Sequence, residues 1–438
     1  MKEVQDYLKI RHFVIIPPSQ VPKDKETLLA VWAMRRKRRI DTREVYKWKA
    51  QLNIGGHKMV KGKRYDETYA PTLLWATTRT WLTLPAFNGW HTQQLDFILA
   101  YPQADIPRPT YMDFQDGITI EGASKEIHCL RVLKNIYGSK DAGRTWYEYF
   151  RNRLIYPTKL GFTQSKIDNC VFYQESTVLL VYTDDCIIID KESQSNIDSL
   201  FKELTQHLNV EDEGQLSDYL GVQINISYAV HQCARYMAEP KQSHAKAMKR
   251  IGRYLLGTRG KGISTTPEVS RGLECYVDSD FCVNWDPNIA EHEPMTLKSR
   301  YGYILKLHGM PVYWASKLYT IITLSTAESE YIALSHAARY LRGTVYLLQE
   351  INDMYRQLQP CRLFEDNTAA YEMAKVPKMR PRTRHINVAY HHFRGDVANG
   401  RLIPCKCATQ DMEADIFTNS KATNKETPIT LRQRIMGW

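Results

Sequence analysis

The tetrapeptide Tyr182-Thr183-Asp184-Asp185 constrains the fold of this chain more than any other segment. Two short apolar runs, residues 178–181 and 186–189, flank it. Apolar runs of this length on either side of a turn predict a buried β-hairpin. Two adjacent carboxylates at a hairpin tip repel each other unless a counter-charge is near, and a divalent cation is the usual one. The pair could be a solvated acidic turn, but its apolar flanks favour a metal site suited to phosphoryl transfer.

Length and composition predict an ordinary globular protein of two or three domains. The chain has 438 residues, 43% of them hydrophobic and 24% charged. Its net charge of +11 suits a polyanionic partner, although such an excess can also serve solubility alone. The nine cysteines form no CxxC pair, so neither a zinc finger nor a disulfide framework is indicated. Without a membrane-length apolar stretch or a signal-peptide pattern, the protein is expected to be intracellular and to contact no membrane.

The order of patterns along the chain places a domain boundary close to residue 272. A helix is expected over residues 74–88, although Pro85 lies inside it and would remove a hydrogen bond. A basic helical stretch is expected over residues 229–257, and breaker residues end it. Short β-like runs follow at 274–277 and 302–307, and a long helix begins near Thr326.

The first half of the chain contains further sequence motifs that narrow the interpretation of the hairpin. Asp96 ends an apolar strand, Tyr101 follows five residues later, and Tyr137-Gly138 precedes a helix that contains Trp146. With the hairpin, these residues resemble the palm of a reverse transcriptase in its Ty1/copia-type retrotransposon form. The resemblance implies that Asp96, Asp184 and Asp185 are catalytic and hold two divalent cations, Mg²⁺ or Mn²⁺.

The same resemblance assigns the nucleotide and the nucleic acid to particular side chains. Tyr101 is expected to be the steric gate that favours deoxynucleoside triphosphates, although the pattern also fits a core aromatic. Tyr182 and Gly138 are expected to join it in nucleotide binding. A basic run in the fingers segment, together with a later lysine, is expected to contact phosphates, in preference to forming a solvated surface or a nuclear localisation signal. These residues are Arg35, Arg36, Lys37, Arg38, Arg39 and Lys49.

A second set of carboxylates follows in the C-terminal half. Asp278, Glu330, Asp366 and Asp415 occur in an order that resembles the Asp-Glu-Asp-Asp set of ribonuclease H, again in its copia-type form. The resemblance implies that all four are catalytic, bind Mg²⁺ or Mn²⁺, and hydrolyse the RNA strand of an RNA–DNA hybrid. Glu328 is the alternative to Glu330 as the glutamate of this set.

The expected fold is α+β, with reverse transcriptase fingers and palm followed by an α/β ribonuclease H-like domain. Fingers and palm are expected over residues 1–226, a basic helical connector over 227–272, the ribonuclease H-like domain over 273–424 and a C-terminal tail over 425–438. The thumb is expected to be largely missing. Residues 223–225 and 227–230 match family segments that are normally separated by several dozen residues, and here they follow each other almost directly. Binding of primer and template, and processivity, are therefore expected to be weak.

Three functions remain open from the sequence. The first is an RNA-directed DNA polymerase with ribonuclease H activity, acting on an RNA template, a DNA primer, deoxynucleoside triphosphates and an RNA–DNA hybrid. The second is an inactive retrotransposon remnant or a non-enzymatic nucleic-acid-binding fragment, and the third is ribonuclease H activity alone. The resemblance implies a location in the cytoplasm or a virus-like particle, with the nucleus as an alternative.

Overall fold

The computed structural model divides into two compact units that differ from the expected domains. Unit 1 comprises Met1–Leu73 and Trp90–Ser217, and unit 2 comprises Leu74–Gly89 and Asp218–Trp438. The helix expected over residues 74–88 thus belongs to unit 2, although it lies within the range expected for fingers and palm. The structure describes residues 2–38, 44–114, 118, 120, 122–155, 160–216, 226–258, 260–264, 266–282, 284–288, 292, 294–351, 360–376, 386, 388–418 and 426–438.

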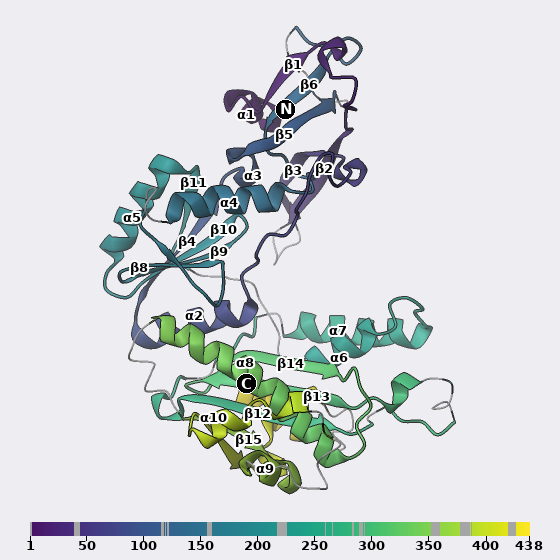
Figure 1. Cartoon of the computed structure of the whole chain (residues 1–438), viewed down its shortest axis with the longest axis vertical. Coiled ribbons are helices and arrows are strands. Elements are labelled where there is room, and N and C mark those ends of the chain that lie inside the picture. The colour runs from purple at the N-terminus through teal and green to yellow at the C-terminus, as the bar shows by residue number, and fades with distance from the viewer. Residues whose placement is uncertain are drawn as a thin grey trace. The chain divides into compact units, whose positions relative to one another are not determined.

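Unit 1 is built on a six-stranded sheet with the order β11-β4-β10-β9-β8-β7 (Figure 1). Strands β9 and β10 form the predicted hairpin, and β10 also pairs antiparallel with β4. The strands are β4 (His91–Phe97), β7 (Thr163–Gln164), β8 (Val171–Gln174), β9 (Thr177–Tyr182), β10 (Asp185–Asp190) and β11 (Val210–Gly214).

Two amphipathic helices cover one face of this sheet. Helix α4 (Ala142–Leu154) buries Trp146, Phe150 and Leu154, which recur every four residues and therefore lie on one side of the helix. Helix α5 (Gln194–His207) buries its own apolar stripe in the same core, and its N-cap Ser193 accepts a hydrogen bond from the Asn196 N–H. This packing fixes the sheet that carries the hairpin.

Two smaller sheets and two short helices complete unit 1. A three-stranded sheet has the order β1-β6-β5, and β2 and β3 form a separate two-stranded ribbon. Their bounds are α1 (Lys2–Lys9), β1 (Phe13–Ile16), β2 (Ala30–Arg38), β3 (Val45–Ile54), α3 (Ala100–Gln103), β5 (Asp105–Asp113) and β6 (Cys129–Lys134).

Unit 2 contains a five-stranded mixed sheet with the order β14-β13-β12-β15-β16. Strands β12, β13 and β14 pair antiparallel, whereas β15 runs parallel to both β12 and β16. The long helix α8 (Thr326–Ile351) packs along this sheet (Figure 1). The segments η9 (Glu413–Phe417) and α11 (Glu426–Met436) join a separate core cluster with β13. The strands are β12 (Leu273–Asp280), β13 (Arg300–Leu307), β14 (Met310–Leu318), β15 (Cys361–Glu365) and β16 (Leu402–Lys406).

The remaining helices of unit 2 differ in part from the sequence expectations. The expected single helix over 229–257 is two helices, because Pro240 disfavours a helical conformation of the residue before it. Residues expected to form a tail instead form α11, whose Ile435 and Met436 are buried. The helices are α2 (Trp75–Asn88), α6 (Ser227–Ala234), α7 (Gln242–Gly257), α8 (Thr326–Ile351), α9 (Thr368–Lys375), α10 (Arg394–Ala398), η9 (Glu413–Phe417) and α11 (Glu426–Met436).

Helix α2 packs on strand β14 of the same unit. The guanidinium carbon of Arg79 lies 3.7 Å from the ring centroid of Trp314, and the rings of Phe87 and His308 stack at 4.9 Å. Gly89 ends the helix with φ of +67°, and Pro85 is accommodated in its last turn. Among the described residues, no helix combines the length and apolarity needed to cross a bilayer.

Candidate functional site

The strand register of unit 1 brings the three palm carboxylates together. Asp185, the first residue of β10, is the register partner of Asp96 on β4 and of Tyr182 on β9. Thr183 and Asp184 form the two-residue turn, and Thr183 has a φ of +58°. The Trp146 indole N–H donates to the Thr183 carbonyl at 2.7 Å, and the Phe97 N–H donates to the Asp184 carbonyl at 2.8 Å. Both neighbouring elements therefore hold the acidic tip in place.

The electrostatics of this cluster show an excess of negative charge. Burial raises the pKa of Asp185 to about 6, and the charges of Asp184 and Asp96 act in the same direction. Burial and Asp184 also raise the pKa of Asp96, while Lys49 on β3 acts in the opposite sense. Glu213 on β11 contributes to both shifts. A divalent cation would relieve this repulsion, because it favours the charged form of every carboxylate around it.

In unit 2, parallel strands deliver a second cluster to one edge of the sheet. Tyr276 on β12 is the register partner of Phe364 on β15, so Asp278 and Asp366 lie side by side two residues later. Glu330 from the first part of α8 joins them, and one ligand oxygen of each of the three residues lies within 4.8 Å of the other two. These three carboxylates could hold a metal ion.

Asp415 on η9 completes the expected set. Burial and the Asp278 charge raise the pKa of Asp415 to about 8, and the two side chains are hydrogen bonded. Burial also raises the pKa of Asp278 to about 6, although a hydrogen bond from the Thr418 hydroxyl opposes that shift. Carboxylates that raise one another's pKa in this way titrate together and attract divalent cations.

Comparison with known proteins identifies the family. The family model described as reverse transcriptase (RNA-dependent DNA polymerase) matches residues 17–238, slightly more than half of the chain. The chain belongs to this reverse transcriptase family. The strand pairing that unites Asp96, Asp184 and Asp185 lies wholly within the matched residues.

Two similar proteins are polyproteins of plant transposons. The chain is 25% identical to the retrovirus-related Pol polyprotein from transposon TNT 1-94 of Nicotiana tabacum, over 93% of this chain and 35% of that protein. It is also 25% identical to the Pol polyprotein from transposon RE1 of Arabidopsis thaliana, over 92% of this chain and 31% of that protein. The chain thus spans about a third of these relatives. The resemblance to Ty1/copia-type polyproteins is confirmed.

A solved structure also aligns with this reverse transcriptase family member. It is the foamy viral protease-reverse transcriptase in complex with double-stranded DNA, with a TM-score of 0.45 and 9% identity. The alignment covers 93% of this chain and 68% of that chain. The α+β fold class is confirmed by the mixed helices and sheets of both units.

The structure separates the two candidate glutamates of unit 2. Glu328 accepts a hydrogen bond from the Leu324 N–H at 2.6 Å, and the Ser325 hydroxyl accepts one from the Glu328 N–H at 3.1 Å. This reciprocal arrangement caps the N-terminus of α8. Glu330, two residues later, lies in the carboxylate cluster instead. The spacing of Ser325 and Glu328 was a capping signal already visible in the sequence.

Two of the three residues predicted to bind the nucleotide, Tyr101 and Tyr182, lie beside the palm cluster. Tyr101 on α3 is partly buried, its ring lies 4.8 Å from that of Tyr137, and the charge of Asp184 contributes to a raised pKa. Tyr182 is partly exposed at the end of β9. Gly138 has a φ of +90°, and an added Cβ there would collide with the Ile54 carbonyl oxygen. Glycine is therefore required at this backbone crossing.

The predicted phosphate-binding residues lie on the β2–β3 ribbon. Arg35 and Lys49 are register partners, and the Arg36 guanidinium lies 5.5 Å from the exposed ring of Trp48. Like charges directly opposite each other destabilise a β-ribbon, so a bound anion would stabilise this pair. The backbone of Lys37 and Arg38 continues β2, whereas Arg39 lies outside the described residues.

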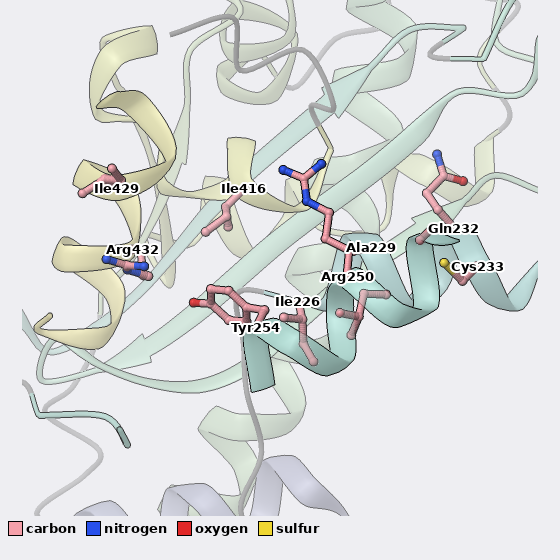
Figure 2. A pocket seen from close by; sticks show the side chains of 11 residues that line it. Ile226, Ala229, Gln232, Cys233, Arg250, Tyr254, Ile416, Ile429 and Arg432 are labelled. Atoms are coloured by element: carbon pink, nitrogen blue, oxygen red, sulfur yellow. The ribbon is translucent and has the colours of Figure 1, made fainter. Parts of the chain in front are cut away.

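The helices expected to form a connector are bound to the sheet of unit 2. The Arg300 guanidinium donates to the Gln232 side-chain oxygen at 3.2 Å, and the Trp314 N–H donates to the Ser227 hydroxyl at 3.1 Å. A cavity of about 480 Å³ lies between α6, α7, η9 and α11. Its lining is mainly apolar, with Arg250 and Arg432 among the polar residues (Figure 2). Residues 227–257 therefore pack into unit 2.

Sequence reasoning missed the acidic residues next to both clusters. Glu211 and Glu213 lie on β11, which pairs with β4, and both raise the pKa of Asp96. Glu365 precedes Asp366, is fully buried, and has a pKa raised well above its ordinary value by burial. Strand alternation was the available signal for Glu365, because Cys361 and Leu363 on the same strand face are apolar or buried.

Proposed function

We propose that this chain is an RNA-directed DNA polymerase with an attached ribonuclease H activity. The observation that carries the proposal is the convergence of seven acidic residues, distant in sequence, into two clusters within a chain of the reverse transcriptase family. The proposed ligands of Mg²⁺ or Mn²⁺ are Asp96, Asp184 and Asp185 in the first cluster and Asp278, Glu330, Asp366 and Asp415 in the second.

The chemistry of both donor sets fits hard divalent cations. All proposed ligands are carboxylates, which Mg²⁺ and Mn²⁺ prefer, and the charges that raise the pKa of Glu330 all come from other carboxylates. Bound cations would lower the pKa of an attacking hydroxyl or water and neutralise charge on the phosphate. The protein's part is to hold the carboxylates in register, which the strand pairs and the Trp146 hydrogen bond do.

The surrounding residues would supply binding and selection. Tyr101 is proposed to exclude ribonucleotides, because a ring beside the carboxylates would collide with a ribose 2′-hydroxyl. The pair Arg35 and Lys49, with Arg36, would contact phosphates of the RNA template and DNA primer. Tyr182 and Gly138 would border the deoxynucleoside triphosphate.

Primer extension tests the polymerase proposal. The purified chain, given a primed RNA template, deoxynucleoside triphosphates and Mg²⁺ or Mn²⁺, should add nucleotides a few at a time. Asp184→Asn should abolish extension, since it removes one carboxylate from the hairpin tip. Extension by Asp184→Asn at the parental rate would overturn the assignment. Long products from single binding events would contradict the expected loss of the thumb.

Hybrid cleavage tests the second cluster separately. The parent should cleave the RNA strand of an RNA–DNA hybrid in the presence of Mn²⁺, and Asp278→Asn should not. Asp184→Asn is the matched control, because it leaves the unit 2 cluster intact. Equal cleavage by Asp278→Asn and the parent would remove the second assignment.

Ribonuclease H activity alone is the second candidate. Only residues 215–226, of which 217–225 lie outside the described part of the chain, separate β11 from α6 where family members are expected to carry a thumb. The unit 2 cluster does not depend on that segment. Hybrid cleavage without any primer extension would favour this candidate.

A further inference from the structure

Glu365 is a buried acidic residue that the proposed metal ligand sets leave unexplained. Its relative exposure is 0%. One carboxylate oxygen accepts a hydrogen bond from the Asn367 N–H at 2.9 Å, whereas Oε2 has no hydrogen-bond partner in the described part of the chain. A buried carboxylate is costly unless a hydrogen bond or a positive charge compensates it. The structure therefore points to a missing partner at Oε2.

The strand geometry directs Glu365 toward α8. Phe364 stacks on Tyr276 at 4.5 Å, so Glu365, the next residue, points to the opposite sheet face with Leu363. On β12, Ser279 is hydrogen bonded to Ser329 of α8, which places α8 over the face that Ser279 shares with Val277. Because β12 and β15 are neighbours, Glu365 faces the helix that carries Glu330.

Glu330 on α8 is also a buried carboxylate with an oxygen that lacks a hydrogen-bond partner among the described residues. Its exposure is 6%, and the oxygen concerned is Oε2. Burial is the main cause of the raised pKa of Glu330, and among the neighbouring charges that of Glu365 raises it most. Glu330 and Glu365 are thus buried carboxylates with unpartnered oxygens, and each raises the pKa of a neighbouring group. They lie next to a group of carboxylates able to hold a metal ion. One positive charge placed there would stabilise both.

We propose that Glu365 is a fifth carboxylate of the divalent-cation site in unit 2, acting together with Glu330. The inference rests on the proposed ribonuclease H function and extends its ligand set beyond Asp278, Glu330, Asp366 and Asp415. The ligand class is a hard divalent cation, Mg²⁺ or Mn²⁺, because all donors are carboxylate oxygens.

Calorimetric titration of the full chain with Mn²⁺ tests the proposal without an activity assay. The part of the binding isotherm that Asp278→Asn abolishes defines the unit 2 site and separates it from the palm. Glu365→Gln should weaken that part by about tenfold or more, the range typical for residues that support a metal site. Glu365→Asp, which keeps the charge but withdraws it by one methylene, should weaken it less.

Glu372→Gln is the matched control, because Glu372 is exposed on the neighbouring helix α9 and the same charge is removed. It should bind Mn²⁺ as the parent does. Without metal, Glu365→Gln should melt at or above the parental temperature, since it removes a buried carboxylate and nearly keeps its shape. Unchanged Mn²⁺ affinity in folded Glu365→Gln would overturn the inference about Glu365 and leave the proposed site itself unaffected. An isotherm that Asp278→Asn leaves unchanged would overturn the proposed site itself.

Discussion

Burial and the charge of Asp278 raise the pKa of Asp415 to about 8, which makes the metal-free protein sensitive to pH near neutrality. A carboxyl group whose pKa is higher in the folded than in the unfolded chain contributes its full stability only below the unfolded pKa. That contribution declines as the pH rises further, because the unfolded chain ionises first, and it is lost completely once the pH passes the folded pKa. Desolvation lowers the pKa of the buried His12 to about 3 and that of the half-buried His336 to about 4. Their contribution to the pH dependence has the opposite sign and is confined to pH values below about 7.

We predict that Asp415 alone lowers the free energy of unfolding, measured with urea and a chelator, by on the order of 1 kcal/mol between pH 7 and 8.5. Asp415→Asn should show a flatter dependence over the same range, because it cannot release that proton. Identical slopes for the parent and the variant would show that Asp415 does not titrate in this window.

The residues of the two carboxylate clusters differ in how well the sequence alone predicts them. Asp184 and Asp185 were predictable because the apolar runs and the turn that position them are adjacent in sequence. The resemblance was the basis for choosing Glu330 over Glu328 as the metal ligand. The spacing of Ser325 and Glu328, which indicates a helix cap, was a second argument against Glu328. For Glu365 the alternation of its strand was a weak signal, because its burial also depends on packing against α8, which the strand pattern does not reveal.

At the scale of elements, the β2–β3 ribbon should bind nucleic acid mainly through charge. We predict that Arg35→Gln combined with Lys49→Gln lowers the slope of log affinity against log salt by about 1 for each phosphate that the ribbon no longer neutralises. Binding of a fluorescent primer–template at several salt concentrations measures this slope. Lys202→Gln, which removes one exposed positive charge on α5, is the control and should leave the slope unchanged. An unaltered slope in the double variant would exclude the ribbon from the interface.

Two glycines of unit 2 should respond in opposite ways to the same substitution. Gly89 ends α2 with φ of +67° in open space, so Gly89→Ala should destabilise unit 2 by about 1 kcal/mol through backbone strain alone. Gly252 lies inside α7 with open space around it, so Gly252→Ala should stabilise the unit by about 0.5–1 kcal/mol. Urea unfolding of both variants measures the difference, and equal effects would contradict the assigned conformations.

The elements also show where pattern reading is insufficient. The β9–β10 hairpin and α8 follow from local periodicity, and the structure confirms both. The C-terminal helix α11 was missed because much of its stability comes from burying Ile435 and Met436 against η9 and β13. Such packing partners are distant in sequence and leave no local signal.

At the scale of the whole molecule, α2 makes unit 2 depend on residues from the first quarter of the chain. We predict that a fragment of residues 226–438 melts at a lower temperature than the same fragment mixed with a saturating peptide of residues 74–89. The peptide restores the contacts of Arg79 with Trp314 and of Phe87 with His308. A peptide with Arg79→Ala and Phe87→Ala is the control and should restore less. Equal melting with and without the peptide would show that the fragment does not need α2.

The path of the backbone has a further consequence for how such a chain can degenerate. The polypeptide passes between the two units three times, after Leu73, Gly89 and Ser217. A truncation or frameshift that removes the first half of the gene therefore also removes a helix from the second unit. The two units therefore cannot be inherited separately as intact modules. Mutational decay of the chain before residue 218 should also reach unit 2 unless its changes spare the sixteen residues of Leu74–Gly89.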